Sequence, residues 1–171
     1  SLPIELDAIG ANYRLLGARA TSPVAGVVKA DAYGLGMARV APALAAAGCT
    51  RFFVAHLNEA IELRALLPAA KIAVLNGLMG GTARDYRAYR LLPVLNDLGQ
   101  VETWQREGAD HDPLPAILHV DTGMARLGLT PAEVDRLAAA PERLAGVPLA
   151  YIMSHLACAD EPAHPLNAVQ L

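Results

Sequence analysis

The stretch VVKADAYGLG, residues 27–36, contains an apolar segment that reaches a lysine and continues into a turn with two glycines. Together with the residues before it, this stretch predicts a strand over 24–30. The Ala- and Leu-rich residues 37–47 then predict a helix that ends at Gly48, a residue type common just after a helix. A strand, a turn and a helix in this order form one β/α unit of a parallel sheet.

Five more apolar segments predict strands, over 51–56, 71–76, 91–96, 116–121 and 150–155. Helices are predicted over 7–20, 58–67, 97–107 and 131–139, and from residue 162 onward. Six β/α units indicate either a (β/α)8 TIM-barrel fold or a doubly wound sheet, and the pattern alone does not separate the two. No GxGxxG motif follows the first strand, which disfavours the dinucleotide-binding kind of sheet.

Composition sets limits on the class of protein. The chain has 171 residues, a net charge of −3 and no basic cluster, so we expect one domain over 1–171 and no nucleic-acid partner. The apolar runs are too short to cross a membrane, and the first residues lack the pattern of a secretory signal, so neither feature is expected. Cys49 and Cys158 are too few for a disulfide framework, so a reduced, cytoplasmic protein is expected.

Lys29 is the first candidate for chemistry. An amine at the mouth of a buried strand becomes a good nucleophile toward an aldehyde when desolvation disfavours its charged form. Tyr33 and the amides of Gly34 and Gly36 follow closely, which suits a phosphate beside the lysine. A Schiff-base lysine next to a phosphate site suggests pyridoxal phosphate (PLP) as the cofactor. The alternative is a surface lysine whose alkyl chain lies along the protein.

Two further motifs follow in the same chain, DTGMARLGL at 121–129 and SHLACAD at 154–160. With the Lys29 segment, and in this order from residue 4 to the last residue, they make the chain resemble the N-terminal part of alanine racemases. The resemblance implies a PLP-dependent isomerase that interconverts L- and D-alanine and supplies D-alanine for peptidoglycan. It also implies a homodimer and a (β/α)8 barrel, here incomplete because about six units are present. Without the last two strands and the C-terminal β domain, the chain alone is expected to be an inactive fragment.

The resemblance also implies roles for single residues. Lys29 matches the lysine that forms the Schiff base with PLP and serves as a catalytic base. Tyr33 matches the tyrosine that binds the cofactor phosphate, and Arg126 the arginine that contacts the cofactor's phenolic oxygen and the substrate carboxylate. His155 matches the histidine that stacks on the pyridine ring, and no metal is expected.

Two positions depart from the family pattern. His119 stands where many members have a lysine that orients the arginine, so the resemblance does not carry that orienting role to position 119, and the neighbouring Asp121 is a second candidate for it. Leu35 replaces a frequent histidine, with little expected consequence because the glycine amides remain. Two other functions stay open: another PLP barrel amino-acid racemase, or a non-catalytic barrel fragment with a vestigial site. Open strands at both edges are expected to favour self-association.

Overall fold

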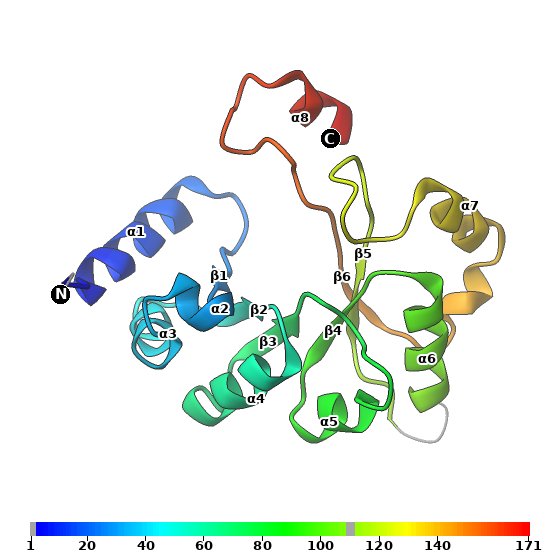
Figure 1. Cartoon of the computed structure of the whole chain (residues 1–171), viewed down its shortest axis with the longest axis horizontal. Helices are drawn as coiled ribbons and strands as arrows, with labels where there is room; N and C mark the ends of the chain where they lie inside the picture. The colour runs from blue at the N-terminus through cyan, green and yellow to red at the C-terminus, as the bar shows by residue number, and fades with distance from the viewer. Residues whose placement is uncertain (1–2, 109–111) are drawn as a thin grey trace. The chain divides into compact units, whose positions relative to one another are not determined.

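A computed structural model of the chain describes residues 3–108 and 112–171, shown in Figure 1. These residues form two compact units. The first runs up to Leu75 and includes 88–92, and the second contains 76–87 and the residues from 93 onward. Neither unit is an all-α or all-β structure, since both alternate parallel strands with helices.

The first unit contains four helices and three strands. They are α1 (Leu6–Arg19), β1 (Gly26–Val27), α2 (Lys29–Tyr33), α3 (Met37–Ala46), β2 (Arg51–Val54), α4 (Leu57–Leu66) and β3 (Lys71–Val74). Strand β2 pairs in parallel with both β1 and β3, and Val54 lies opposite Val74. Phe52, Val54 and Ile72 are completely or almost completely buried, because side chains in a parallel sheet are covered by helices.

Arg64 ties helix α4 to the chain that surrounds its carboxyl end. Its guanidinium donates to the carbonyls of Leu67, Pro68 and Ala70 at 2.7–3.3 Å, and to those of Tyr89 and Arg90 at 2.9 and 2.8 Å. These five hydrogen bonds provide donors for carbonyl groups that a helix end and two loops leave without partners. This explains why a segment as late as 88–92 belongs to the first unit.

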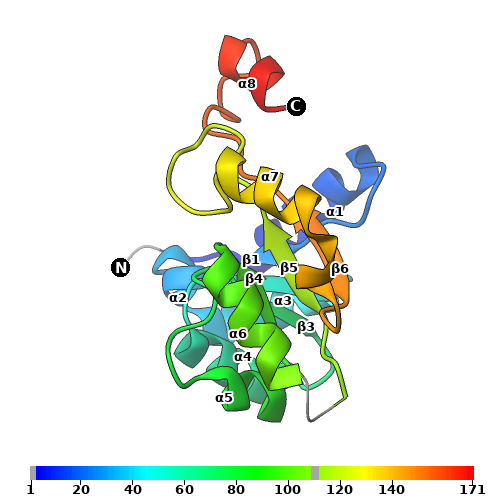
Figure 2. The same ribbon diagram turned by 90° about the vertical axis from the view of Figure 1, so that its right-hand side faces the viewer.

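The second unit contains the remaining elements. They are most of α5 (Ala83–Ala88) and β4 (Leu92–Leu95), then α6 (Leu98–Gly108), β5 (Ala116–His119), α7 (Pro131–Ala139), a 3-10 turn η1 (Pro141–Leu144), β6 (Leu149–Met153) and α8 (Pro165–Gln170). Strand β5 pairs in parallel with β4 and β6, with a register shift between Ala116 and Ile117. Figure 2 shows α8 at the end of the long segment that follows β6.

Several predictions from the sequence are confirmed. Helix α7 has the predicted range 131–139, and it begins at a capping box in which the Thr130 hydroxyl accepts from the Glu133 amide and the Glu133 carboxylate accepts from the Thr130 amide. Both cysteines are free, and Cys49 is buried. Among the helices of the described residues, none is both long and apolar enough to cross a membrane.

Candidate functional site

The Lys29 segment differs from its prediction. The prediction that the strand runs through Lys29 is wrong, because β1 ends at Val27 and the backbone at Val28 has already left the extended conformation (φ −123°, ψ 23°). The Val28 amide still donates to the Phe53 carbonyl at 2.9 Å. Lys29 is half-buried and lies at the start of α2, directly after the last strand-like hydrogen bond.

Helix α2 is a left-handed turn. Ala30, Asp31, Ala32 and Tyr33 all have φ between 51° and 57°, a region that costs a non-glycine residue about 1–2 kcal/mol. Within the turn, the Ala32 amide donates to the Val28 carbonyl at 2.9 Å. The Asp31 carboxylate accepts from the Met37 amide at 2.7 Å and so fixes the beginning of α3. Four consecutive non-glycine residues in this conformation require such outside support.

The glycine amides after the turn are not available to a ligand. Gly34 N–H donates to the Ala30 carbonyl at 3.0 Å, and Gly36 N–H donates to the Asp31 carbonyl at 2.9 Å. The prediction that these amides bind a phosphate is therefore wrong. Lys29 Nζ lies 5.9 Å from the ring centroid of Tyr33, a residue that is 63% exposed.

In the second unit, the loop after β5 carries Arg126 as an exposed side chain. The loop is closed by a bridge between Val120 and Leu129. The Asp121 carboxylate accepts from the amides of Gly123 and Ala125 at 2.9 and 3.0 Å, and these two hydrogen bonds hold the pKa of Asp121 below its usual value. Asp121 thus contributes to this site by holding the backbone just before Arg126.

Gly128 permits the loop to close tightly. A Cβ at this position would lie 2.7 Å from the Asp121 amide nitrogen, and φ is +111°. Both the space and the backbone conformation therefore require glycine there.

His119 lies beneath this loop and is 6% exposed. Its Nδ1 is 2.8 Å from Asn96 Oδ1, while Asn96 Nδ2 donates to the Val94 carbonyl at 3.0 Å. The amide orientation makes Asn96 the acceptor, so Nδ1 of His119 carries the proton. Burial first, and then the nearby charge of His155, lowers the pKa of His119. The neutral ring consequently leaves Nε2 as a hydrogen-bond acceptor.

The prediction that the last strand reaches His155 is also wrong, because β6 ends at Met153. Its side chain is exposed, and its carbonyl accepts from Nε2 of Gln170 at 3.0 Å. The same Gln170 amide donates to the Thr122 hydroxyl at 3.2 Å, which lies 2.6 Å from the Ser154 hydroxyl. Gln170 is thus a buried residue of α8 that links the Arg126 loop with the His155 loop. No sequence motif indicates this role.

The structure therefore brings Lys29 together with Tyr33 in the first unit. In the second unit it gathers Arg126, His155 and His119, since the charges of the first two both lower the pKa of the third. Among the described residues, no group of three His, Cys, Asp or Glu side chains could hold a metal ion.

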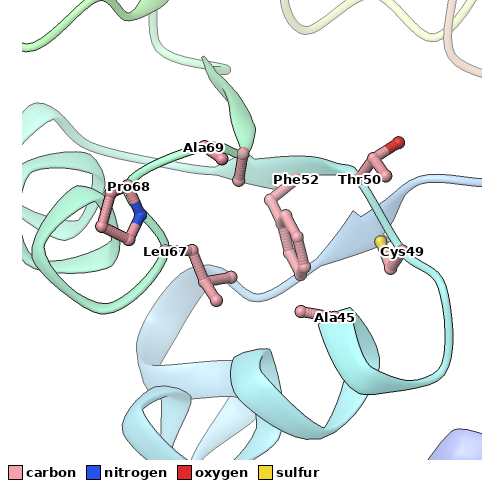
Figure 3. Close-up of a pocket in the computed structure, with 8 residues that line it drawn as sticks. Ala45, Cys49, Thr50, Phe52, Leu67, Pro68 and Ala69 are labelled. Carbon is pink, nitrogen blue, oxygen red and sulfur yellow. The ribbon is translucent and has the colours of Figure 1, made fainter.

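A separate cavity of about 230 Å³ in the first unit is lined mainly by apolar groups (Figure 3). The ring of Phe52 faces Ala45 and Leu67 in it. It lies at the amino ends of β2 and β3, the edge opposite Lys29, and it offers nothing to the chemistry of Lys29.

The comparison with protein families matches residues 4–171 to the N-terminal domain of alanine racemase. The chain belongs to the alanine racemase N-terminal domain family. The alanine racemase of Acidiphilium cryptum is 52% identical over 170 residues, covering 99% of this chain and 48% of the relative. The chain therefore spans about half the length of the curated alanine racemases it matches.

Solved structures give the fold. The Bartonella henselae alanine racemase, which has covalently bound pyridoxal phosphate, matches 98% of this chain and 49% of its own with a TM-score of 0.92 and 40% identity. The predicted α/β fold, a (β/α)8 type incomplete at about six units, is confirmed, and the doubly wound alternative is set aside. A histidine racemase from Leuconostoc mesenteroides also matches, with a TM-score of 0.83, 28% identity, and coverage of 96% of this chain and 45% of its own.

Proposed function

We propose that this chain is the cofactor-binding part of a PLP-dependent alanine racemase and that Lys29 binds the cofactor covalently. The observation that carries the proposal is the position of Lys29. The chain has two lysines, and only Lys29 is half-buried, follows the carboxyl end of a strand and lies beside a phenol. Lys71 is exposed at the amino end of β3. The matched Bartonella enzyme supports covalent attachment, since it contains the cofactor in that form.

The residues present fit this group chemically. The Lys29 amine suits its aldehyde carbon, and the exposed Tyr33 hydroxyl suits a phosphate oxygen. Gly34 and Gly36 have open space where a Cβ would stand, so a ligand can approach the turn. Arg126 and His155 are both exposed and can meet an anion and an aromatic ring.

PLP, when bound, withdraws electrons from the α-carbon of an amino acid and makes its hydrogen acidic. Nζ of Lys29, released when the substrate amine takes its place on the cofactor, would then take this proton, or return it, on one face of the α-carbon. By the family resemblance, the Tyr33 hydroxyl would donate to a phosphate oxygen, and the His155 imidazole would pack against the cofactor's ring. Arg126 would present two parallel N–H groups to the substrate carboxylate, a geometry that lysine lacks.

The assembled enzyme is proposed to be a cytoplasmic homodimer that supplies D-alanine for peptidoglycan. Alanine as substrate is supported by the names of the curated relatives. The cytoplasmic location is supported by the two free cysteines. The dimer rests on the family resemblance.

The test is to add PLP to the purified chain, follow visible absorption, reduce with borohydride and map the modified peptides. The proposal predicts a reducible adduct at Lys29 in excess over Lys71, and no such band in Lys29→Ala. Equal modification of Lys29 and Lys71 would overturn it. A cofactor-dependent rise in melting temperature that Lys29→Ala abolishes would also exclude a vestigial site.

A second candidate is a racemase for another amino acid, favoured by the match to the histidine racemase. The full-length protein, assayed with alanine and with histidine, separates the two by the ratio of their kcat/KM values. A larger kcat/KM for histidine would replace alanine in the proposal.

A further inference from the structure

Glu59, on α4, connects two segments that lie far apart in the sequence. Its Oε2 accepts from the amides of Ala55 and His56 at 2.8 and 3.0 Å. Its Oε1 accepts from the Ala30 amide at 2.6 Å. One carboxylate therefore receives three backbone N–H groups, and one of these belongs to the residue directly after Lys29.

The two oxygens serve different purposes. Oε2 completes an amino-terminal cap, because Glu59 is the third residue of α4 and His56 is the residue before its start. A cap needs only this oxygen. Oε1 reaches across 29 positions to the left-handed turn, and the hydrogen bond is short, as expected when the acceptor is charged.

The Ala30 amide needs an acceptor outside the turn. The amide hydrogen bonds of the turn begin at Ala32, whose N–H donates to the Val28 carbonyl. Ala30 is the first residue with a left-handed conformation, at φ 51°. Without Glu59, the Ala30 amide loses its partner at the point where the backbone changes hand.

We infer that Glu59 is a positioning residue for Lys29. The Val28 amide is held by Phe53, and the Ala30 amide is held by Glu59, so the backbone is fixed on both sides of Lys29. These two hydrogen bonds set the direction in which the Lys29 side chain projects from the backbone. The inference rests on the proposed covalent role of Lys29 and adds a residue that the cofactor need not touch.

The test compares Glu59→Gln with Glu62→Gln, a matched control on the same helix whose side chain is exposed. Amide hydrogen exchange is measured at Ala30. The initial rate of borohydride trapping by added PLP is measured at Lys29, with Lys71 in the same molecule as internal standard. Glutamine has one acceptor oxygen where glutamate has two, so Glu59→Gln is expected to keep the cap within its own helix and to lose the Ala30 contact. Exchange at Ala30 is then expected to accelerate by about tenfold, the equivalent of one charge-assisted hydrogen bond. Glu59→Gln is also expected to lower the Lys29-to-Lys71 trapping ratio by a similar factor, while Glu62→Gln changes neither.

The outcomes separate this inference from the proposed function. If the unchanged chain shows no preference for Lys29 over Lys71, the proposed function fails. If that preference exists and Glu59→Gln leaves it intact, Glu59 only caps α4 and the inference fails. Should Glu59→Gln not fold, Glu59→Asp keeps the charge and shortens the reach by one methylene. This variant is expected to keep the cap and lose the Ala30 contact, with the same fall in the trapping ratio, and an unchanged ratio contradicts the inference.

Discussion

Replacing Gly77 with alanine tests the packing that supports Asn96 and, through it, His119. Gly77 has φ +71°, and a Cβ there would lie 2.6 Å from the Val94 carbonyl oxygen. It would also collide with Oε1 of Gln100. The Val94 carbonyl belongs to β4 and cannot move without disturbing the sheet, so the Gln100 side chain must leave.

The cost follows from three contributions. An alanine in the left-handed region costs about 1 kcal/mol or more. Gln100 Oε1 accepts from the amides of Leu78 and Asn96, each at 3.2 Å. Losing these two hydrogen bonds costs about 1 kcal/mol each. We therefore expect Gly77→Ala to lower the free energy of unfolding by about 3 kcal/mol, with any distortion at Val94 in addition.

The assay is urea unfolding followed by the fluorescence of Trp104, the only tryptophan, which is buried in the same unit. Gly80→Ala is the matched control, because no heavy atom lies within 4 Å of its added Cβ and no left-handed φ is required. The control is expected to change the free energy of unfolding by about 0.5 kcal/mol or less. The loss in free energy of unfolding is compared between the two variants. If the loss in Gly77→Ala exceeds that in Gly80→Ala by less than about 1 kcal/mol, the reasoning about the close approach is wrong.

Three further predictions concern hydrogen bonds of the second unit. Burial lowers the pKa of His119 in the folded chain, so the unfolded chain takes up a proton at this ring at a higher pH than the folded chain does. The free energy of unfolding therefore falls as the pH drops below about 6.5, with a slope of at most about 1.4 kcal/mol per pH unit. Urea unfolding at pH 7.5 and 5.5 should show a smaller pH effect in His119→Gln, and an equal effect refutes this. Asp121→Ala should accelerate amide exchange at Ala125 by about tenfold, because the Ala125 amide loses its acceptor. Asp121→Asn should accelerate it less, because asparagine keeps an acceptor oxygen. Equal exchange rates in Asp121→Ala and the unchanged chain contradict this prediction. Tyr86→Phe removes a buried hydrogen bond of 2.6 Å to the Gly77 carbonyl and should lower the free energy of unfolding, followed by Trp104 fluorescence, by about 1–3 kcal/mol. A change near zero would show that this carbonyl finds another donor.

Local sequence rules predicted much of the fold. Apolar segments placed the six strands of the described residues, although β1 ends at Val27, three residues before its predicted end, and β6 ends at Met153, two residues before its predicted end. The helix predicted over 131–139 is α7, with the same bounds. Helix α5 was not predicted, because it is a single short segment, Ala83–Ala88, in a Gly- and Arg-rich region without a clear apolar period.

The candidate site was predicted less completely, for a physical reason. Neighbours in sequence, such as Lys29 and Tyr33, are also neighbours in space. The left-handed turn between them was missed because alanines and a tyrosine have no preference for that conformation, and distant hydrogen bonds impose it. The partners Asn96 and Gln170 were missed for the same reason, since they act on residues 15 to 48 positions away.

The handedness of the turn after Lys29 has a kinetic consequence. The residues from Ala30 to Tyr33 favour the opposite hand by about 1–2 kcal/mol each, so the turn cannot loosen gradually around its present conformation. Once its outside anchors release, the four residues are expected to reverse together to the right-handed form. The backbone that carries Lys29 would then behave as a two-state element, either held in place or fully released. Motion of this kind between discrete states falls in the microsecond-to-millisecond range, where NMR relaxation dispersion measures the population of the released state of the turn.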